Sequence, residues 1–139
     1  MGRRLSRENA MKLLYQFQLR NDDIEEQIEL FLSENENLDD LEKDYFFDIV
    51  RGATGKLKEI DKLIESHAKG WSLERMPKVD LAIMRLAIYE LIYRDDIPFT
   101  VSINEAVELA KKYGADQSKA FINGILGKIV AELRLIKEQ

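Results

Sequence analysis

The chain has 139 residues, of which 45% are hydrophobic and 34% are charged, and its net charge is −5. This length suits one domain, and the apolar fraction is sufficient for a hydrophobic core. The sequence has no cysteine and no apolar leader at its N-terminus, which excludes disulfide bonds and cysteine-ligated zinc and leads us to expect a cytoplasmic protein.

The charge is distributed unevenly along the chain. Residues 1–20 contain five basic residues against Glu8 alone, whereas residues 21–48 contain twelve acidic residues against Lys43 alone. An acidic protein with a basic N-terminal segment can still bind a polyanion locally, because charges are screened beyond about 8–10 Å at ordinary salt. For the acidic run we favour a solvated surface over a partner site.

Apolar residues recur at spacings of three and four throughout, which predicts an all-α protein. The first helix is predicted to begin after Ser6, as N-cap, and to end at Arg20. Its buried stripe comprises Ala10, Leu13, Leu14 and Phe17. A capping-box pattern at residues 22–25 predicts the start of a second helix, which should end at Asn35 and Asn37.

A second capping-box pattern, at residues 39–42, predicts the start of a longer helix. Its apolar stripe keeps one phase past Gly52 and Gly55, so we predict a single helix to about Ala68, bent near these glycines. Gly70 should close it. The fragment GATGK within this helix lacks the spacing of a phosphate-binding loop and follows no strand, which argues against a nucleotide site.

The next segments form a corner and the most apolar stretch of the chain. Trp71 is predicted to anchor the corner, and residues 72–76 to form a short helical turn. In residues 79–93, twelve of fifteen positions are apolar, and the polar ones, Asp80, Arg85 and Glu90, share no single face. We predict a central buried helix, too short and too charged to span a membrane, in which Arg85 and Glu90 need partners.

The C-terminal part is predicted to contain two more helices. A third capping-box pattern, at residues 102–105, opens a helix that ends at Gly114. The last helix should run from about residue 116 or 118 to Leu135. Gly124 and Gly127 lie within it, and their cost in helix stability suggests close approach of a neighbouring helix.

Few residues could support catalysis or bind a metal. His67 is the single histidine, and we expect it to be a surface or capping residue. The acidic run lacks the alternating pattern of a calcium loop, and no glycine-rich strand-to-helix loop is present for a dinucleotide. The sequence therefore shows no clear catalytic, metal or cofactor site, and a hydrolase that uses two carboxylates stays an open alternative at this point.

Two groups of residues favour binding to nucleic acid. Arg3, Arg4 and Arg7, with Lys12 further on, can contact phosphates or stack on bases. The second group surrounds one interhelical turn and consists of Lys111, Lys112, Tyr113, Gln117, Lys119 and Phe121. Basic, amide and aromatic side chains in one place are typical of single-stranded RNA recognition. The alternative, in which Phe121 is core and the lysines are only solvated, is equally consistent with the composition.

Residues 84–114 (MRLAIYELIYRDDIPFTVSINEAVELAKKYG), residues 118–126 (SKAFINGIL) and residues 4–19 (RLSRENAMKLLYQFQL) closely resemble the NusB family of bacterial transcription antitermination factors. The resemblance covers essentially the whole chain. It implies a compact all-α domain of about seven helices in two subdomains, about 1–70 and 71–139. It also implies a non-enzymatic factor that binds boxA RNA with the ribosomal protein NusE in the transcription elongation complex, notably on rRNA operons.

The resemblance also implies particular site residues. It carries over Arg3, Arg4, Arg7, Tyr15 and Phe121. With Lys112, Gln117 and Lys119 from the interhelical turn, these are the candidate RNA-binding residues. The family commonly has a basic residue immediately before the phenylalanine, where this chain has Ala120. Lys119 lies one residue earlier, which rotates its side chain by about 100° around the helix, so it replaces the family's RNA contact only if it can still reach the RNA. Glu74 and Asp80 are candidates for contact with NusE. Alternatively, Glu74 favours a helix N-terminus and Asp80 pairs with Arg85.

A second interpretation is a stand-alone domain related to the N-terminal module of rRNA cytosine methyltransferases, which the resemblance also covers. The sequence up to Gln139 has no βαβ segment or glycine-rich loop for a methyl donor, which favours the antitermination factor. A third interpretation is a purely structural protein without an RNA role.

Overall fold

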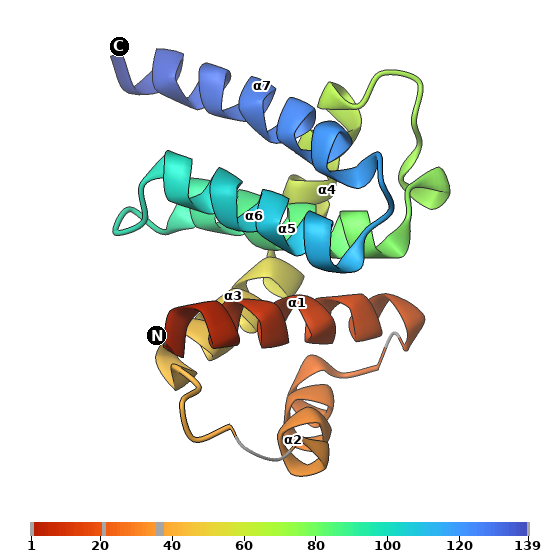
Figure 1. Cartoon of the computed structure of the whole chain (residues 1–139), viewed down its shortest axis with the longest axis vertical. Coiled ribbons are helices and arrows are strands. Elements are labelled where there is room, and N and C mark those ends of the chain that lie inside the picture. The colour runs from red at the N-terminus through yellow and green to blue at the C-terminus, as the bar shows by residue number, and fades with distance from the viewer. Residues whose placement is uncertain (1, 21, 36–37, 139) are drawn as a thin grey trace.

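The computed structural model describes residues 2–20, 22–35 and 38–138, which form seven α-helices and one short 3-10 helix. The all-α prediction is confirmed. Figure 1 shows two groups of helices stacked along the longest axis. The first group comprises α1 (Gly2–Leu19), α2 (Ile24–Glu34) and α3 (Lys43–Gly55). The second comprises α4 (Leu57–His67), the 3-10 helix (Leu73–Arg75), α5 (Lys78–Tyr93), α6 (Phe99–Tyr113) and α7 (Ser118–Glu138).

The chain passes from the first group to the second at Lys56. α3 packs mainly on α1 and α5, whereas α4 packs on α5 and α7. The predicted division into two subdomains near residue 70 would place α4 with the first group, and that division stays a prediction. Within the described residues, no helix is long and apolar enough to cross a membrane.

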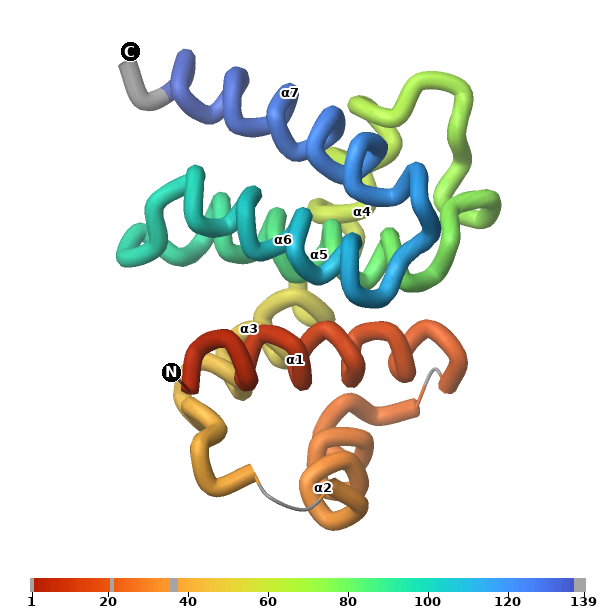
Figure 2. The backbone as a smooth tube through the Cα atoms, in the orientation of Figure 1, coloured from red at the N-terminus to blue at the C-terminus, as the bar shows by residue number. Residues whose placement is uncertain are grey.

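α5 is the central helix, as predicted from its apolar sequence. Every residue from Asp80 to Leu91 is buried, and α1, α3, α4, α6 and α7 all pack against it (Figure 2). The two charged residues at its centre have the partners that burial demands. Arg85 donates to both carboxylate oxygens of Asp61, at 2.9 and 2.8 Å, and Glu90 accepts from Arg7.

Gly52 allows α3 to lie close against α5. A Cβ atom at this position would lie 2.2 Å from Cζ of Tyr89, whose hydroxyl donates to Asp48 at 2.8 Å. We expect Gly52→Ala to lower the free energy of unfolding by about 1–3 kcal/mol, because the ring must move, as measured by urea denaturation. Gly55→Ala is the matched control, since a Cβ there meets nothing within 4 Å. An equal loss in both variants would contradict a packing role for Gly52.

The predicted N-caps at Ser6 and Ser102 are wrong. α1 begins at Gly2, and α6 begins at Phe99 directly after Pro98, so both serines lie inside helices and are buried. Their hydroxyls connect different elements. Ser6 Oγ donates to the Gly2 carbonyl and accepts from the backbone N–H of Glu42, each at 2.6 Å, and Ser102 Oγ donates to Glu90 at 2.8 Å.

The capping box at residues 39–42 is also wrong. α3 begins at Lys43, and the carboxylate of Glu42 binds Arg3 instead of capping the helix. The single long helix is divided into α3 and α4 at Lys56, where φ is −113° and ψ is 23°. A shared apolar phase on both sides of a bend therefore does not require one continuous helix.

The α2 boundaries are close to the prediction. Asp23 is the N-cap, one residue later than the first residue of the expected capping box, and its carboxylate accepts from the Glu25 N–H at 3.0 Å. Asn35 is the C-cap, as predicted. Asn37 lies outside the described residues.

The glycines in α7 do not mark a helix contact. A Cβ atom at Gly124 or Gly127 would meet nothing within 4 Å, and both positions are exposed. The predicted close approach of a neighbouring helix is wrong, and α7 continues past Leu135 to Glu138.

Candidate nucleic-acid interface

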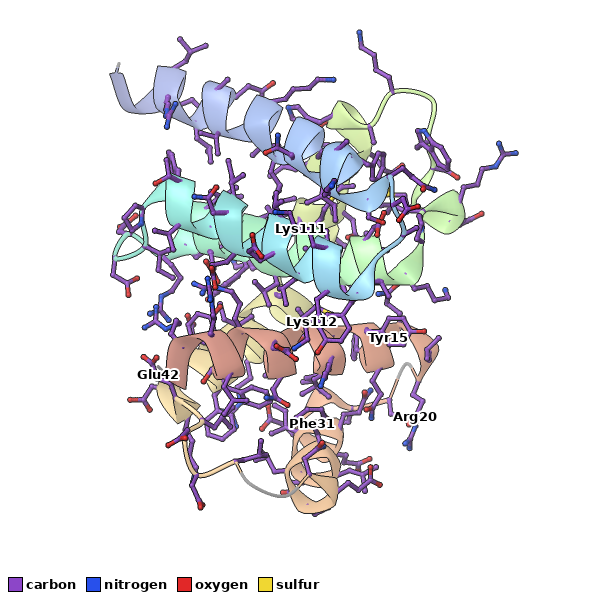
Figure 3. All side chains as sticks on the ribbon, in the orientation of Figure 1. Tyr15, Arg20, Phe31, Glu42, Lys111 and Lys112 are labelled. Carbon is purple, nitrogen blue, oxygen red and sulfur yellow. The ribbon has the colours of Figure 1, made fainter. Side chains whose placement is uncertain are left out.

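A polar groove lies between α1 and α6 and has a volume of about 350 Å³. Its lining consists of Arg4, Arg7, Glu8, Glu105, Glu108, Leu109, Lys111 and Lys112. Figure 3 shows Lys111 on α6 and Lys112 at the boundary between α6 and α1. The structure therefore brings two of the three predicted N-terminal arginines together with two lysines of the predicted second group.

Arg7 belongs to the interior of the protein. Its side chain is 4% exposed, and its guanidinium donates to both oxygens of Glu90, at 2.8 and 3.2 Å. Burial alone would lower the pKa of Arg7, but the bond to Glu90 together with the nearby Tyr45, Glu90 and Glu105 raises it, and the side chain stays charged. Glu90 also accepts hydrogen bonds from Ser102 and Tyr45. Arg7 thus joins α1 to α5 and is not accessible to a phosphate.

The other two arginines differ in their accessibility. Arg3 forms a bidentate pair with Glu42, at 2.8 and 2.7 Å, and its guanidinium lies 4.5 Å from the centre of the Tyr45 ring. Arg4 also binds a carboxylate, that of Glu105, with both hydrogen bonds at 3.1 Å, but its side chain is 77% exposed. Of the three, Arg4 is the arginine that RNA can reach most readily.

Lys112 is held in a similar way by Glu8. Its Nζ donates to Glu8 at 2.9 Å, and the Tyr113 hydroxyl donates to the same carboxylate. Burial alone would raise the pKa of Glu8, but the hydrogen bonds from Tyr113 and Lys112 hold it below its ordinary value. The carboxylates of Glu8 and Glu105 therefore balance the groove cations in the free protein.

The acidic partners should make stability depend on pH. The Arg4 hydrogen bond lowers the pKa of Glu105, and the pKa of Glu8 is lowered as well. A carboxyl group whose pKa is lower in the folded state stabilises the protein at pH values above its unfolded-state pKa of about 4.3. This stabilisation is lost as the pH falls through the pKa of the folded state. We expect the unfolding free energy to fall below about pH 4.5, and to fall less in Glu8→Gln/Glu105→Gln. Urea titrations with the same pH slope for both proteins would contradict this.

The turn between α6 and α7 is tightly built and exposes two predicted site residues. Ser118 is buried and accepts from the Ala115 N–H at 3.0 Å, while a Cβ atom at Gly114 would lie 2.7 Å from the Ser118 side chain. Gln117 and Lys119 are exposed on either side of Ser118. Within the described residues, no carboxylate lies in ion-pair distance of Lys119, in contrast to Arg4 and Lys112.

The predicted aromatic contacts are partly buried. Phe121 packs edge-to-face on Trp71 with ring centres 5.9 Å apart, so it is neither fully core nor fully exposed. Tyr15 also packs partly against the core, and in the view of Figure 3 it lies at the α1–α6 boundary. The structure therefore combines the two interpretations of Phe121 that the sequence left open.

The two candidates for partner contact have different positions. Glu74 is exposed on the 3-10 helix. Asp80 is 2% exposed, burial raises its pKa against the effect of the Ser118 hydroxyl, and its Oδ1 has no hydrogen-bond partner among the described residues. Arg85 binds Asp61, so the suggested Asp80–Arg85 pair is wrong. The buried position of Asp80 argues against direct contact with a partner.

His67 joins two helices and does not project freely from the surface. Its Nε2 lies 2.9 Å from Glu132 on α7, and its Nδ1 lies 2.8 Å from the Leu63 carbonyl. Among the described residues, no three histidine or acidic side chains are grouped to hold a metal.

Sequence reasoning missed the acids that position the basic residues. Glu42, Glu90 and Glu105 bind arginines that lie 39 to 101 residues away in the chain. Glu90 alone carried a signal, because a charge inside an apolar helix requires a partner, but nothing local identified that partner.

Comparisons with known proteins place this geometry in a family. The NusB family model matches residues 4–131. The transcription antitermination protein NusB of Acetivibrio thermocellus is 58% identical over 130 residues, which cover 94% of this chain and 89% of that protein. The protein of the same name from Ruminiclostridium cellulolyticum is 51% identical over 129 residues, covering 93% and 88%.

Solved structures show the same architecture. NusB of T. maritima superimposes with a TM-score of 0.84 at 38% identity, covering 95% of this chain and 92% of that chain. A chain from a crystal structure of antitermination factors NusB and NusE in complex with dsRNA gives a TM-score of 0.79 at 29% identity, covering 91% and 94%.

Proposed function

Since this chain belongs to the NusB family of transcription antitermination proteins, which are not enzymes, we propose that it binds boxA-type single-stranded RNA together with NusE. In this role it helps RNA polymerase, with other Nus factors, to read through terminators, notably in rRNA operons. The protein would act in the cytoplasm, on nascent RNA. The observation that carries the proposal is the grouping of Gln117, Lys119 and Phe121 at one turn, which follows Lys112 in the chain.

The chemistry of this turn suits unpaired bases. An amide can bond to base edges, an aromatic ring can stack, and a lysine that has no carboxylate partner among the described residues can contact a phosphate. Arg4 and Lys112 would contribute further phosphate contacts from the groove. Arg3 and Arg7 would act indirectly by fixing α1. Tyr15 is retained as a candidate stacking residue, and Glu74 as the candidate acid for NusE.

The direct test is fluorescence anisotropy of labelled boxA RNA titrated with this protein, with and without NusE, at two salt concentrations. We expect weak binding alone and tighter binding with NusE, because few cations face the RNA. The controls are a scrambled RNA and the same sequence as a duplex, both expected to bind more weakly, and Phe121→Asp should abolish the preference for boxA. Equal binding of boxA and scrambled RNA in both conditions would overturn the proposal.

The groove acids should weaken RNA binding. Glu8 and Glu105 occupy Lys112 and Arg4 in the free protein, so an incoming phosphate must replace a carboxylate and tolerate its charge nearby. We expect Glu8→Gln/Glu105→Gln to bind boxA RNA about two- to tenfold more tightly, because ion pairs with exposed cations are weak and their loss has a modest effect. Glu25→Gln, which breaks the exposed pair with Arg51, is the matched control. Unchanged affinity in the double variant would place the RNA outside the groove.

A further inference from the structure

Trp71 is presented on the surface next to the α6–α7 turn. It is the single tryptophan of the sequence, and the structure leaves it 49% exposed at the corner that it is predicted to anchor. Figure 2 shows the segment between α4 and α5 passing beside the first turn of α7. Trp71 there packs on Phe121 with an angle of 61° between the rings.

The backbone holds Trp71 in a defined position. Gly70 has φ of +78°, a conformation that favours glycine, and the Trp71 N–H donates to the Ala68 carbonyl at 3.0 Å. These constraints fix the backbone of Trp71, and the edge-to-face contact with Phe121 positions the indole before any ligand arrives. A pre-positioned ring loses little conformational freedom on binding.

The surroundings of the aromatic pair fit a nucleic-acid base better than a protein. Trp71 follows the exposed Lys69 and Gly70, and the exposed positions of α7 around Phe121 are small or polar and comprise Lys119, Ala120, Asn123 and Gly124. A protein-docking centre requires a wider apolar area. One exposed indole, with the exposed Lys69 two residues before it and Lys119 two residues before Phe121, matches a single base with its flanking phosphates.

We propose that Trp71, supported by Phe121, is a stacking platform for one unpaired base of the bound RNA, extending the RNA path from the α6–α7 turn to the α4–α5 corner. The inference rests on the proposed function. It adds a binding residue that lies outside both sequence motifs for RNA, and it assigns the indole to a base and not to the protein partner.

Intrinsic fluorescence tests this directly, because all indole emission comes from Trp71. Unlabelled boxA RNA should quench this emission, and the midpoint of the quenching titration should equal that of the anisotropy titration. Replacing the stacked nucleotide by an abasic one should remove the quenching. Trp71→Ala should weaken RNA binding by roughly five- to a hundredfold, the range for one stacked base, whereas Trp71→Phe should retain most of the affinity.

The matched control moves the tryptophan. In Trp71→Phe/Tyr93→Trp the indole lies at the opposite end of α5, a helix of 16 residues and therefore about 24 Å long. RNA should bind this variant without quenching. If RNA binds the unmodified protein without changing the Trp71 emission, the proposal that Trp71 stacks on a base is wrong, whereas the proposed function is unaffected. Quenching by NusE alone, without RNA, would also overturn it and assign Trp71 to the protein partner. Absence of any boxA binding would overturn both.

Discussion

Replacing Glu90 with leucine is expected to lower the free energy of unfolding by about 3–5 kcal/mol, because the change leaves the buried Arg7 without its main partner. The pair joins α1 to the central helix, with side chains that are 4% and 1% exposed. The same change also removes the acceptor for the Ser102 and Tyr45 hydroxyls. Urea denaturation measures the loss, and a loss below about 1 kcal/mol would contradict a structural role for the pair.

The double variant Arg7→Met/Glu90→Leu distinguishes the effect of leaving a buried charge without a partner from the effect of altered packing. Removing both charges at once avoids an uncompensated buried charge, so we expect it to recover at least half of the loss. A double-mutant cycle with the single variants gives the coupling between the two side chains. Additive losses would show that the two residues act independently.

Neutralising the accessible cations is expected to have the largest effect on RNA binding. In Arg4→Gln/Lys112→Gln/Lys119→Gln, three phosphate contacts are lost, each contributing about 0.7 to the dependence of log affinity on log salt for a single strand. The salt slope should therefore fall by about 2, and affinity for boxA RNA by about 100-fold at 0.1 M salt. Anisotropy titrations over a salt series measure both quantities.

A variant with the same change in net charge provides the control. Lys43, Lys58 and Lys62 are exposed on α3 and α4 and do not line the groove, and their replacement by glutamine should leave the slope nearly unchanged. Similar losses in both triple variants would show that the RNA responds to net charge and not to this surface.

The sequence predicts well those features that depend on local composition, and less well those that depend on contacts between distant residues. The twelve apolar positions of residues 79–93 require burial on all sides, so the central helix follows from composition alone. A capping-box pattern predicts a helix start less reliably, because in the folded protein the same serine can form a hydrogen bond with a neighbouring helix instead. Ser102 does so through Glu90, twelve residues earlier in the chain.

The candidate site shows the same limit. The sequence identifies the basic residues, but their accessibility depends on acids that approach only in the folded chain. Arg4 and Arg7 lie three positions apart, yet one is exposed and the other is buried against Glu90. Trp71 and Phe121 likewise meet across 50 residues of sequence, so their pairing is visible only in the structure.

NMR mapping of the RNA surface tests the central claim most directly. With uniformly ¹⁵N-labelled protein and unlabelled boxA RNA, we predict that amide signals of residues 2–8 and 111–121 shift or broaden first, and that NusE strengthens these changes. A response confined to α2 or α4, with these residues unaffected at saturating RNA, would contradict the claim that the α1–α6 groove and the α6–α7 turn bind RNA.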